Sequence, residues 1–177
     1  MPARLTLIFL FQLLTGCASV GGFEISQALP ERTVAGNPLG GLLGGFVDVP
    51  IPLDVDVASQ TAARDTGPAT ALRLTDLRLR ITSTEEPPGD EDDFAFIESA
   101  EVFVASAASD STLPRVRVAT ASQPPAGARE LVFTTDSSVD LLPYAREGAE
   151  LSAEASGEAP PDDVSFDGAI VLAVEVL

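Results

Sequence analysis

The sequence predicts an all-β protein built as a single antiparallel β-sandwich of about eight strands, immunoglobulin-like in architecture. Three observations carry this prediction. Apolar and polar residues alternate in short runs, turns containing proline or glycine separate the runs at regular spacing, and almost no stretch shows helical periodicity. We find no internal repeat and no second domain, so residues 23–177 are expected to form one domain. A closed, lipocalin-like barrel is the alternative architecture for the same pattern.

The domain is expected to begin with one strand and a glycine-rich loop. Phe23–Leu29 reads as the first strand, and Pro30 is expected to stop it because proline has no N–H for a β-ladder. Residues 36–46 combine repeated glycines with leucines and predict a loop folded over the open end of the core. An apolar lip that contacts lipid or a partner is the alternative. The glycine spacing does not match a phosphate-binding loop.

The next two predicted strands carry charges that would face each other. Residues 53–57 alternate strictly, with Asp54 and Asp56 pointing outward. Residues 72–81 form the longest predicted strand, but the alternation of its leucines changes parity once. A β-bulge near Thr75-Asp76 would restore a single inward face. The outward arginines of this strand would then lie opposite the two aspartates if the strands are neighbours.

A dense acidic segment, residues 85–93, follows. Its prolines and glycine exclude a strand. Carboxylate oxygens could hold a calcium ion here, although the spacing matches no EF-hand; the candidate ligands are Asp90, Glu91, Asp92 and Asp93. A solvated acidic loop or a helix N-terminus is the alternative interpretation.

The rest of the chain supplies the remaining elements. We expect one helical turn at 94–97, strands at 100–104, 116–118 and 131–133, a short helical connection within 138–146 ended by Gly148, a weak edge strand at 151–155, and a strong strand at 170–176. The last strand is nearly apolar on both faces, which favours a central position in its sheet.

The segment before the predicted domain has the order of a secretory signal: Arg4, an apolar run of about ten residues, and a small-residue cleavage site. The apolar run is too short to span a bilayer as a helix, which takes about twenty residues. Leu14-Thr15-Gly16-Cys17 resembles the lipobox of bacterial lipoproteins, with an aliphatic residue three positions before the cysteine and a small residue directly before it. A buried cysteine in an N-terminal helix is the alternative.

This resemblance implies where the protein is located in the cell. Residues 1–16 would be a signal peptide that is removed, Cys17 would become the acylated N-terminus, and residues 17–22 would form a short linker. Two or three acyl chains anchor a protein stably, whereas one gives only marginal binding. Because Ala18 rather than an aspartate follows the cysteine, the resemblance implies anchoring at the outer membrane, with the domain periplasmic or surface-facing. The expected partners are the lipid bilayer, through the acyl chains, and an unknown envelope protein.

Composition narrows the function classes. Removing residues 1–16, which contain Arg4 and no acid, leaves nine basic against 27 acidic residues, a formal charge of about −18. Such a chain is repelled by phosphate, so we exclude nucleic acid as a partner. Histidine and lysine are absent, as is a second cysteine, so the sequence predicts no enzyme, no zinc site and no cofactor.

The sequence therefore predicts a non-catalytic, membrane-anchored lipoprotein of the bacterial envelope, with the sandwich in a binding or structural role. The alternative is a protein that binds an anionic ligand or an acidic polymer through a row of arginines, provided that their strands share a sheet. This candidate face comprises Arg73, Arg78, Arg80, Arg115 and Arg117. An arginine face neutralised by Asp54, Asp56 and Glu101 is the competing interpretation of the same residues.

Overall fold

We analysed a computed structural model, which describes residues 21–37, 51–53, 55–82 and 92–177. Nine strands and two short helices form in this part of the chain. The strands are β1 (Gly21–Val34), β2 (Ile51–Leu53), β3 (Ala69–Ile81), β4 (Ile97–Ser106), β5 (Val116–Ser122), β6 (Glu130–Val132), β7 (Thr134–Thr135), β8 (Ala149–Gly157) and β9 (Val164–Val176). The helices are α1 (Val57–Ala63) and α2 (Leu142–Glu147).

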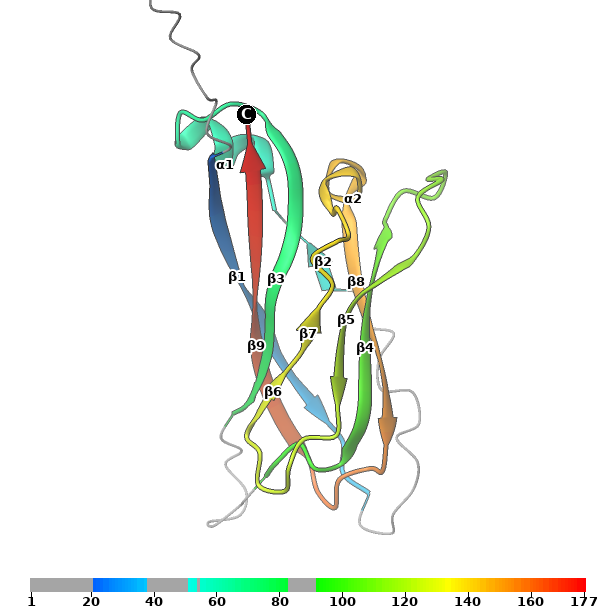
Figure 1. Cartoon of the computed structure of the whole chain (residues 1–177). Helices are drawn as coiled ribbons and strands as arrows, with labels where there is room; N and C mark the ends of the chain where they lie inside the picture. Colours follow the sequence, from blue (N-terminus) through cyan, green and yellow to red (C-terminus); the bar gives the residue numbers. More distant parts are fainter. Residues whose placement is uncertain (1–20, 38–50, 54, 83–91) are drawn as a thin grey trace, which may run out of the picture.

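The strands form two antiparallel sheets, which confirms the predicted fold class. One sheet has the order β1-β9-β3-β6 and the other the order β2-β8-β4-β5-β7. The sheets are separate layers rather than one closed barrel, and both helices lie at the same end of the elongated sandwich (Figure 1). None of the helices in the described ranges is long and apolar enough to cross a membrane.

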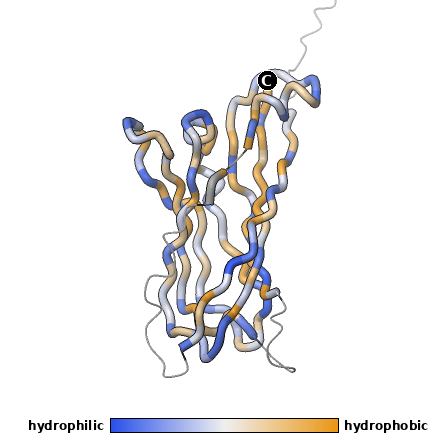
Figure 2. Tube along the Cα trace, turned by 180° about the vertical axis from the view of Figure 1, so that it is seen from behind, coloured by the Kyte–Doolittle hydropathy of each residue, from blue (hydrophilic) through white to orange (hydrophobic). Residues whose placement is uncertain are grey.

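The core lies between the two sheets and is made by alternate residues of the long strands. Leu72 and Leu74 of β3, Val104 of β4, and Ile170 and Leu172 of β9 are at most 1% exposed. Hydrophobic residues follow the strands, whereas hydrophilic residues gather in the loops at both ends (Figure 2). Burying one such aliphatic side chain contributes about 1.5–3 kcal/mol, so this alternation is the main source of stability.

Two detailed expectations about the first sheet are confirmed. β9 lies in the interior of the sheet, between β1 and β3, as its two apolar faces predict. The pairing of β3 with β9 shifts register between Leu74 and Asp76, where the bulge was expected. Because of this shift, Leu72, Leu74 and Leu77 are all buried on the same side of the strand.

The prediction that Pro30 stops the first strand is wrong. β1 pairs with β9 on both sides of Pro30, and the register shifts between Leu29 and Arg32. β1 is an edge strand, so one side of its backbone needs no ladder partner there. An irregularity on an edge strand is one of the few places where a sheet tolerates a residue without an N–H.

The prediction of a strand at 53–57 is also wrong, because β2 ends at Leu53. Asp56 is instead the N-cap of α1, where its carboxylate accepts hydrogen bonds from the Ser59 backbone N (2.9 Å) and the Ser59 Oγ (2.5 Å). An N-cap carboxylate satisfies a backbone N–H that has no partner within the helix. The Ser59 hydroxyl is the main reason that the pKa of Asp56 lies below its ordinary value. Asp54 lies outside the described residues.

The second sheet differs from expectation in β8 as well as in β2, and it contains β7, which was not predicted. The weak edge strand at 151–155 is longer, and it is interior: β8 pairs with β4 along its length and with β2 over a short stretch. The helical connection forms as α2, and Gly148, at φ 84°, ends it in a conformation that glycine adopts without strain. The predicted turn at 94–97 is closed by a 3.0 Å hydrogen bond from the Ile97 N to the Phe94 O.

Candidate functional site

The predicted lipidation site, Cys17, lies outside the described residues, as does the whole Leu14–Cys17 motif. The start of the domain is described. Gly21 and Gly22, expected in the linker, belong to β1 and pair with Val176 and Glu175 of β9. Only residues 18–20 separate Cys17 from β1, and four residue steps reach about 14 Å at most. An acylated Cys17 would therefore hold this end of the sandwich close to the bilayer.

The five arginines of the candidate anion face do not lie in one row. Arg73, Arg78 and Arg80 are on β3 in the first sheet, whereas Arg117 is on β5 in the second sheet and Arg115 directly precedes it. The condition that their strands share a sheet is not met. The cations therefore cannot act together on one flat ligand surface.

Most of these arginines have carboxylate partners within the sandwich. The ion pairs are Arg73–Glu175 (2.8 Å), Arg78–Asp76 (2.8 Å), Arg115–Glu154 (2.7 Å) and Arg117–Glu101 (2.5 Å). Glu101 was expected to neutralise an arginine, whereas Asp56 caps α1 instead. Arg80 forms no ion pair with any residue that the structure describes. Exposed pairs of this kind contribute about 0–1 kcal/mol each, so they neutralise charge more than they stabilise the fold.

The candidate calcium ligands are only partly described. Asp90 and Glu91 lie outside the described residues, and Asp92 is buried. Asp93 uses both carboxylate oxygens, because Oδ1 accepts from the Ala95 N (2.9 Å) and Oδ2 from the Gly127 N (2.6 Å). Asp93 thus caps the turn that follows it and fastens the loop between β5 and β6. Within the described ranges, no group of three or more His, Cys, Asp and Glu side chains is arranged to hold a metal ion.

A cleft of about 660 Å³ lies beside Asp92 and Asp93, at the end of the sandwich opposite the helices. Five carboxylates line it together with apolar side chains, and no basic residue is among the described lining. The lining includes Asp92, Asp93, Glu98, Glu158 and Asp162, with Phe96, Pro160, Pro161 and Val164. Carboxylates concentrated in a concave surface attract cations and repel phosphate and other anionic groups. We refer to it below as the acidic cleft.

Sequence reasoning found only part of this cleft. Asp92 and Asp93 were singled out as candidate ligands, whereas Glu98, Glu158 and Asp162 were not. These residues are far apart in the chain and meet only because β4, β8 and β9 begin or end at the same end of the sandwich. The strand order was the missing information, and no short motif carries it.

The turn that borders the acidic cleft is tied to the far end of β1. The Gly36 N donates to the Asp163 Oδ1 (2.8 Å), and the Asn37 N donates to the Pro160 O (2.8 Å). These contacts show that β1 runs from the end at Gly21 to the end that carries the cleft.

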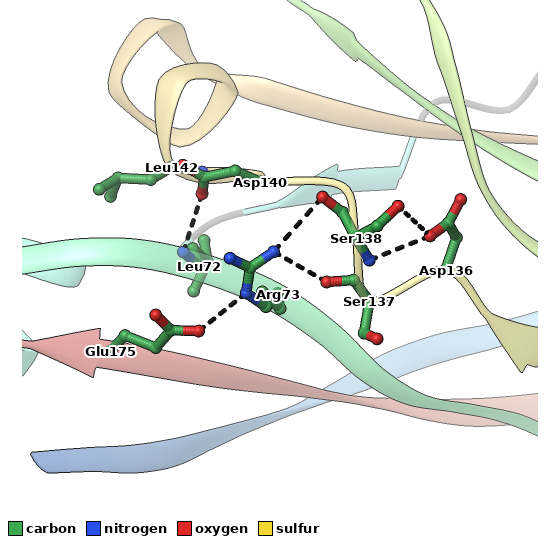
Figure 3. A network of polar contacts seen from close by, with 8 residues as sticks. All are labelled: Leu72, Arg73, Asp136, Ser137, Ser138, Asp140, Leu142 and Glu175. Atoms are coloured by element: carbon green, nitrogen blue, oxygen red, sulfur yellow. Dashed lines mark hydrogen bonds and ion pairs between the residues drawn. The ribbon is translucent and has the colours of Figure 1, made fainter. Parts of the chain in front are cut away.

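A polar network at the opposite end joins the loop before α2 to the first sheet (Figure 3). The Asp140 Oδ1 accepts from the backbone N of both Leu72 and Leu142, each at 3.0 Å. Arg73 donates through Nη1 to the Ser137 O (2.8 Å) and through Nε to Glu175 (2.8 Å). The network fixes α2 relative to β3 and β9.

The loop at 107–115 is held to α2 by two further side chains. The Tyr144 hydroxyl donates to the Pro114 O (2.8 Å), and burial raises the pKa of Tyr144. The Glu147 Oε2 accepts from the Ser106 Oγ (2.9 Å) and the Ser111 Oγ (2.5 Å). The Ser111 hydroxyl, followed by that of Ser106, holds the pKa of Glu147 below its ordinary value of 4.5.

We expect the double variant Ser106→Ala, Ser111→Ala to raise the pKa of Glu147 toward 4.5, because it removes both hydroxyl donors. Since folding lowers this pKa, the contacts stabilise the fold above the unfolded value and lose this effect as the pH falls through the lowered native value. NMR titration of the Glu147 carboxyl carbon measures the change. Ser99→Ala removes a hydroxyl whose partner is Ser156, and it should leave the titration of Glu147 unchanged. An unmoved midpoint in the double variant would contradict the assignment.

In comparisons with known proteins, no protein-family model matches this chain, and no curated protein shows significant similarity to it.

Proposed function

We propose that the protein is a non-catalytic lipoprotein of the bacterial envelope, anchored to the outer membrane through acyl chains on Cys17. Its β-sandwich would bind another envelope component or serve as a structural domain. One observation carries the proposal: the lipobox-like motif Leu14–Cys17 stands directly before the domain, with only residues 18–20 between Cys17 and the first strand. An acyl anchor at that position leaves almost no free linker.

The charge of the domain supports the need for such an anchor. The chain carries 27 acidic and 10 basic residues, so anionic lipid headgroups would repel the domain rather than recruit it. Two or three acyl chains would outweigh this repulsion, since each buried methylene contributes about 0.8 kcal/mol. The anionic-ligand alternative is not favoured, because its arginines are divided between the two sheets and four of them pair with acids.

Protease accessibility tests the envelope location. An antibody against the sandwich domain would follow digestion in intact cells, in cells with a permeabilised outer membrane, and in lysed cells. Digestion in intact cells places the domain outside the cell, and digestion after permeabilisation places it in the periplasm. Protection until the inner membrane is lysed would contradict the proposal. A cytoplasmic protein, measured in the same samples, is the control that the inner membrane stayed intact.

A further inference from the structure

We infer that the sandwich faces the lipid headgroups with the end formed by α1, α2 and the loop at 107–115, and holds the acidic cleft away from the bilayer. We call these two ends the helical end and the cleft end. The inference rests on the proposed acylation of Cys17 and extends it, because it assigns the surface of the domain that meets the membrane.

The direction of β1 is the first argument that the helical end meets the membrane. β1 begins at the helical end, beside α1 and the end of β9, and runs the length of the sandwich (Figure 1). From Gly21 to Val34 it makes thirteen residue steps, a length of about 43 Å at 3.3 Å per residue. The chain between Cys17 and Gly21 reaches about 14 Å at most. The tether is therefore much shorter than the domain, and the helical end must stay next to the lipid.

A domain fixed at one end could still lie on its side. The charge distribution is the second argument, and it favours an upright domain. Tilting would bring the acidic cleft, with its five carboxylates, toward the headgroups. Anionic lipids and the loss of water both oppose that approach. The helical end also carries acids, but arginines lie among them, whereas no arginine is among the described lining of the cleft; its acids include Asp56, Asp65, Asp110 and Glu147, and its arginines Arg64, Arg115 and Arg146. The upright orientation avoids this repulsion.

The third argument is that the helical end forms one fixed surface. The contacts of Tyr144 and Glu147 hold the loop at 107–115 against α2.

Energy transfer to labelled lipid tests the orientation. Cys17 is the only cysteine and would be acylated, so one cysteine introduced elsewhere can carry a donor dye. Two exposed positions serve: Ser109→Cys in the loop at 107–115, and Ala126→Cys in the loop between β5 and β6 at the cleft end. The acylated protein would be reconstituted in vesicles of phosphatidylcholine and the anionic lipid phosphatidylglycerol, with a headgroup-linked acceptor dye that has a short transfer distance.

We expect the donor at position 109 to be quenched several-fold more strongly than the donor at position 126. Equal quenching, or stronger quenching at 126, would overturn the inference. Flotation of the protein with the vesicles is measured in the same samples. A protein that does not float shows that the proposed anchoring has failed, whereas a protein that floats with equal quenching shows that only the orientation is wrong. The same labels on Cys17→Ser protein should give no quenching at either position.

Discussion

Replacing Cys17 by serine is expected to move the protein from the detergent phase to the aqueous phase when bacterial membranes are extracted with a detergent that separates on warming. The hydroxyl of serine cannot accept diacylglycerol in place of the thiol, so the variant would carry no acyl chains. The described sandwich has no apolar helix that could replace them. The variant should therefore be found as an uncleaved precursor or as a soluble exported protein.

Ser19→Ala is the matched control for this variant. It replaces one small residue by another, two positions after the cysteine, and leaves the motif Leu14–Cys17 intact. Its protein should remain in the detergent phase, like the wild type. An uncleaved precursor keeps the apolar run of residues 1–16 and is distinguished by its larger mass. If Cys17→Ser protein that has lost residues 1–16 partitions into the detergent phase as completely as the control, acylation of Cys17 is refuted.

Truncating Leu172 to alanine is expected to lower the free energy of unfolding by about 3–4 kcal/mol, which is a large part of the total stability of a domain of this size. Leu172 is fully buried in β9, with Ile25 of β1 and Leu74 of β3 as its register partners. Its removal leaves a cavity between the two sheets that the neighbouring strands can only partly fill. Urea unfolding, followed by circular dichroism, measures the change.

Val171→Ala is the control, because Val171 directly precedes Leu172 in the same strand and points to the opposite face. It is only partly buried, so we expect a loss below about 1 kcal/mol. Equal losses in the two variants would contradict a core that lies between the sheets on one face of β9.

The fold class was predictable because burial imposes a period of two on every long strand. The shift of register in β3 was predictable for the same reason, since its leucines reach one face only if an extra residue is inserted near Asp76. The extent of β1 was not predictable, because whether Pro30 breaks a strand depends on whether that strand lies at an edge. Asp56 was misassigned since two flanking valines resemble a strand, although Ser59 three residues later is a plausible capping partner.

The distribution of charge could not be predicted in the same way. The alternation of residues shows that Arg73, Arg78 and Arg117 point outward. Only the strand order shows that Arg117 lies in a different sheet from the other two. Their partners are likewise distant in sequence, as Glu175 is from Arg73. The acidic cleft depends on the same information, because its carboxylates come from the start of β4 and from loops that meet only after the sheets have formed.

The most direct test of the central claim is the mass of the N-terminal peptide of the protein purified from bacterial membranes. We predict a peptide that begins at Cys17 and carries two or three acyl chains, with residues 1–16 removed. A peptide in which Cys17 is unmodified, whether residues 1–16 are still attached or have been cleaved, would contradict the lipid anchor and with it the proposed function.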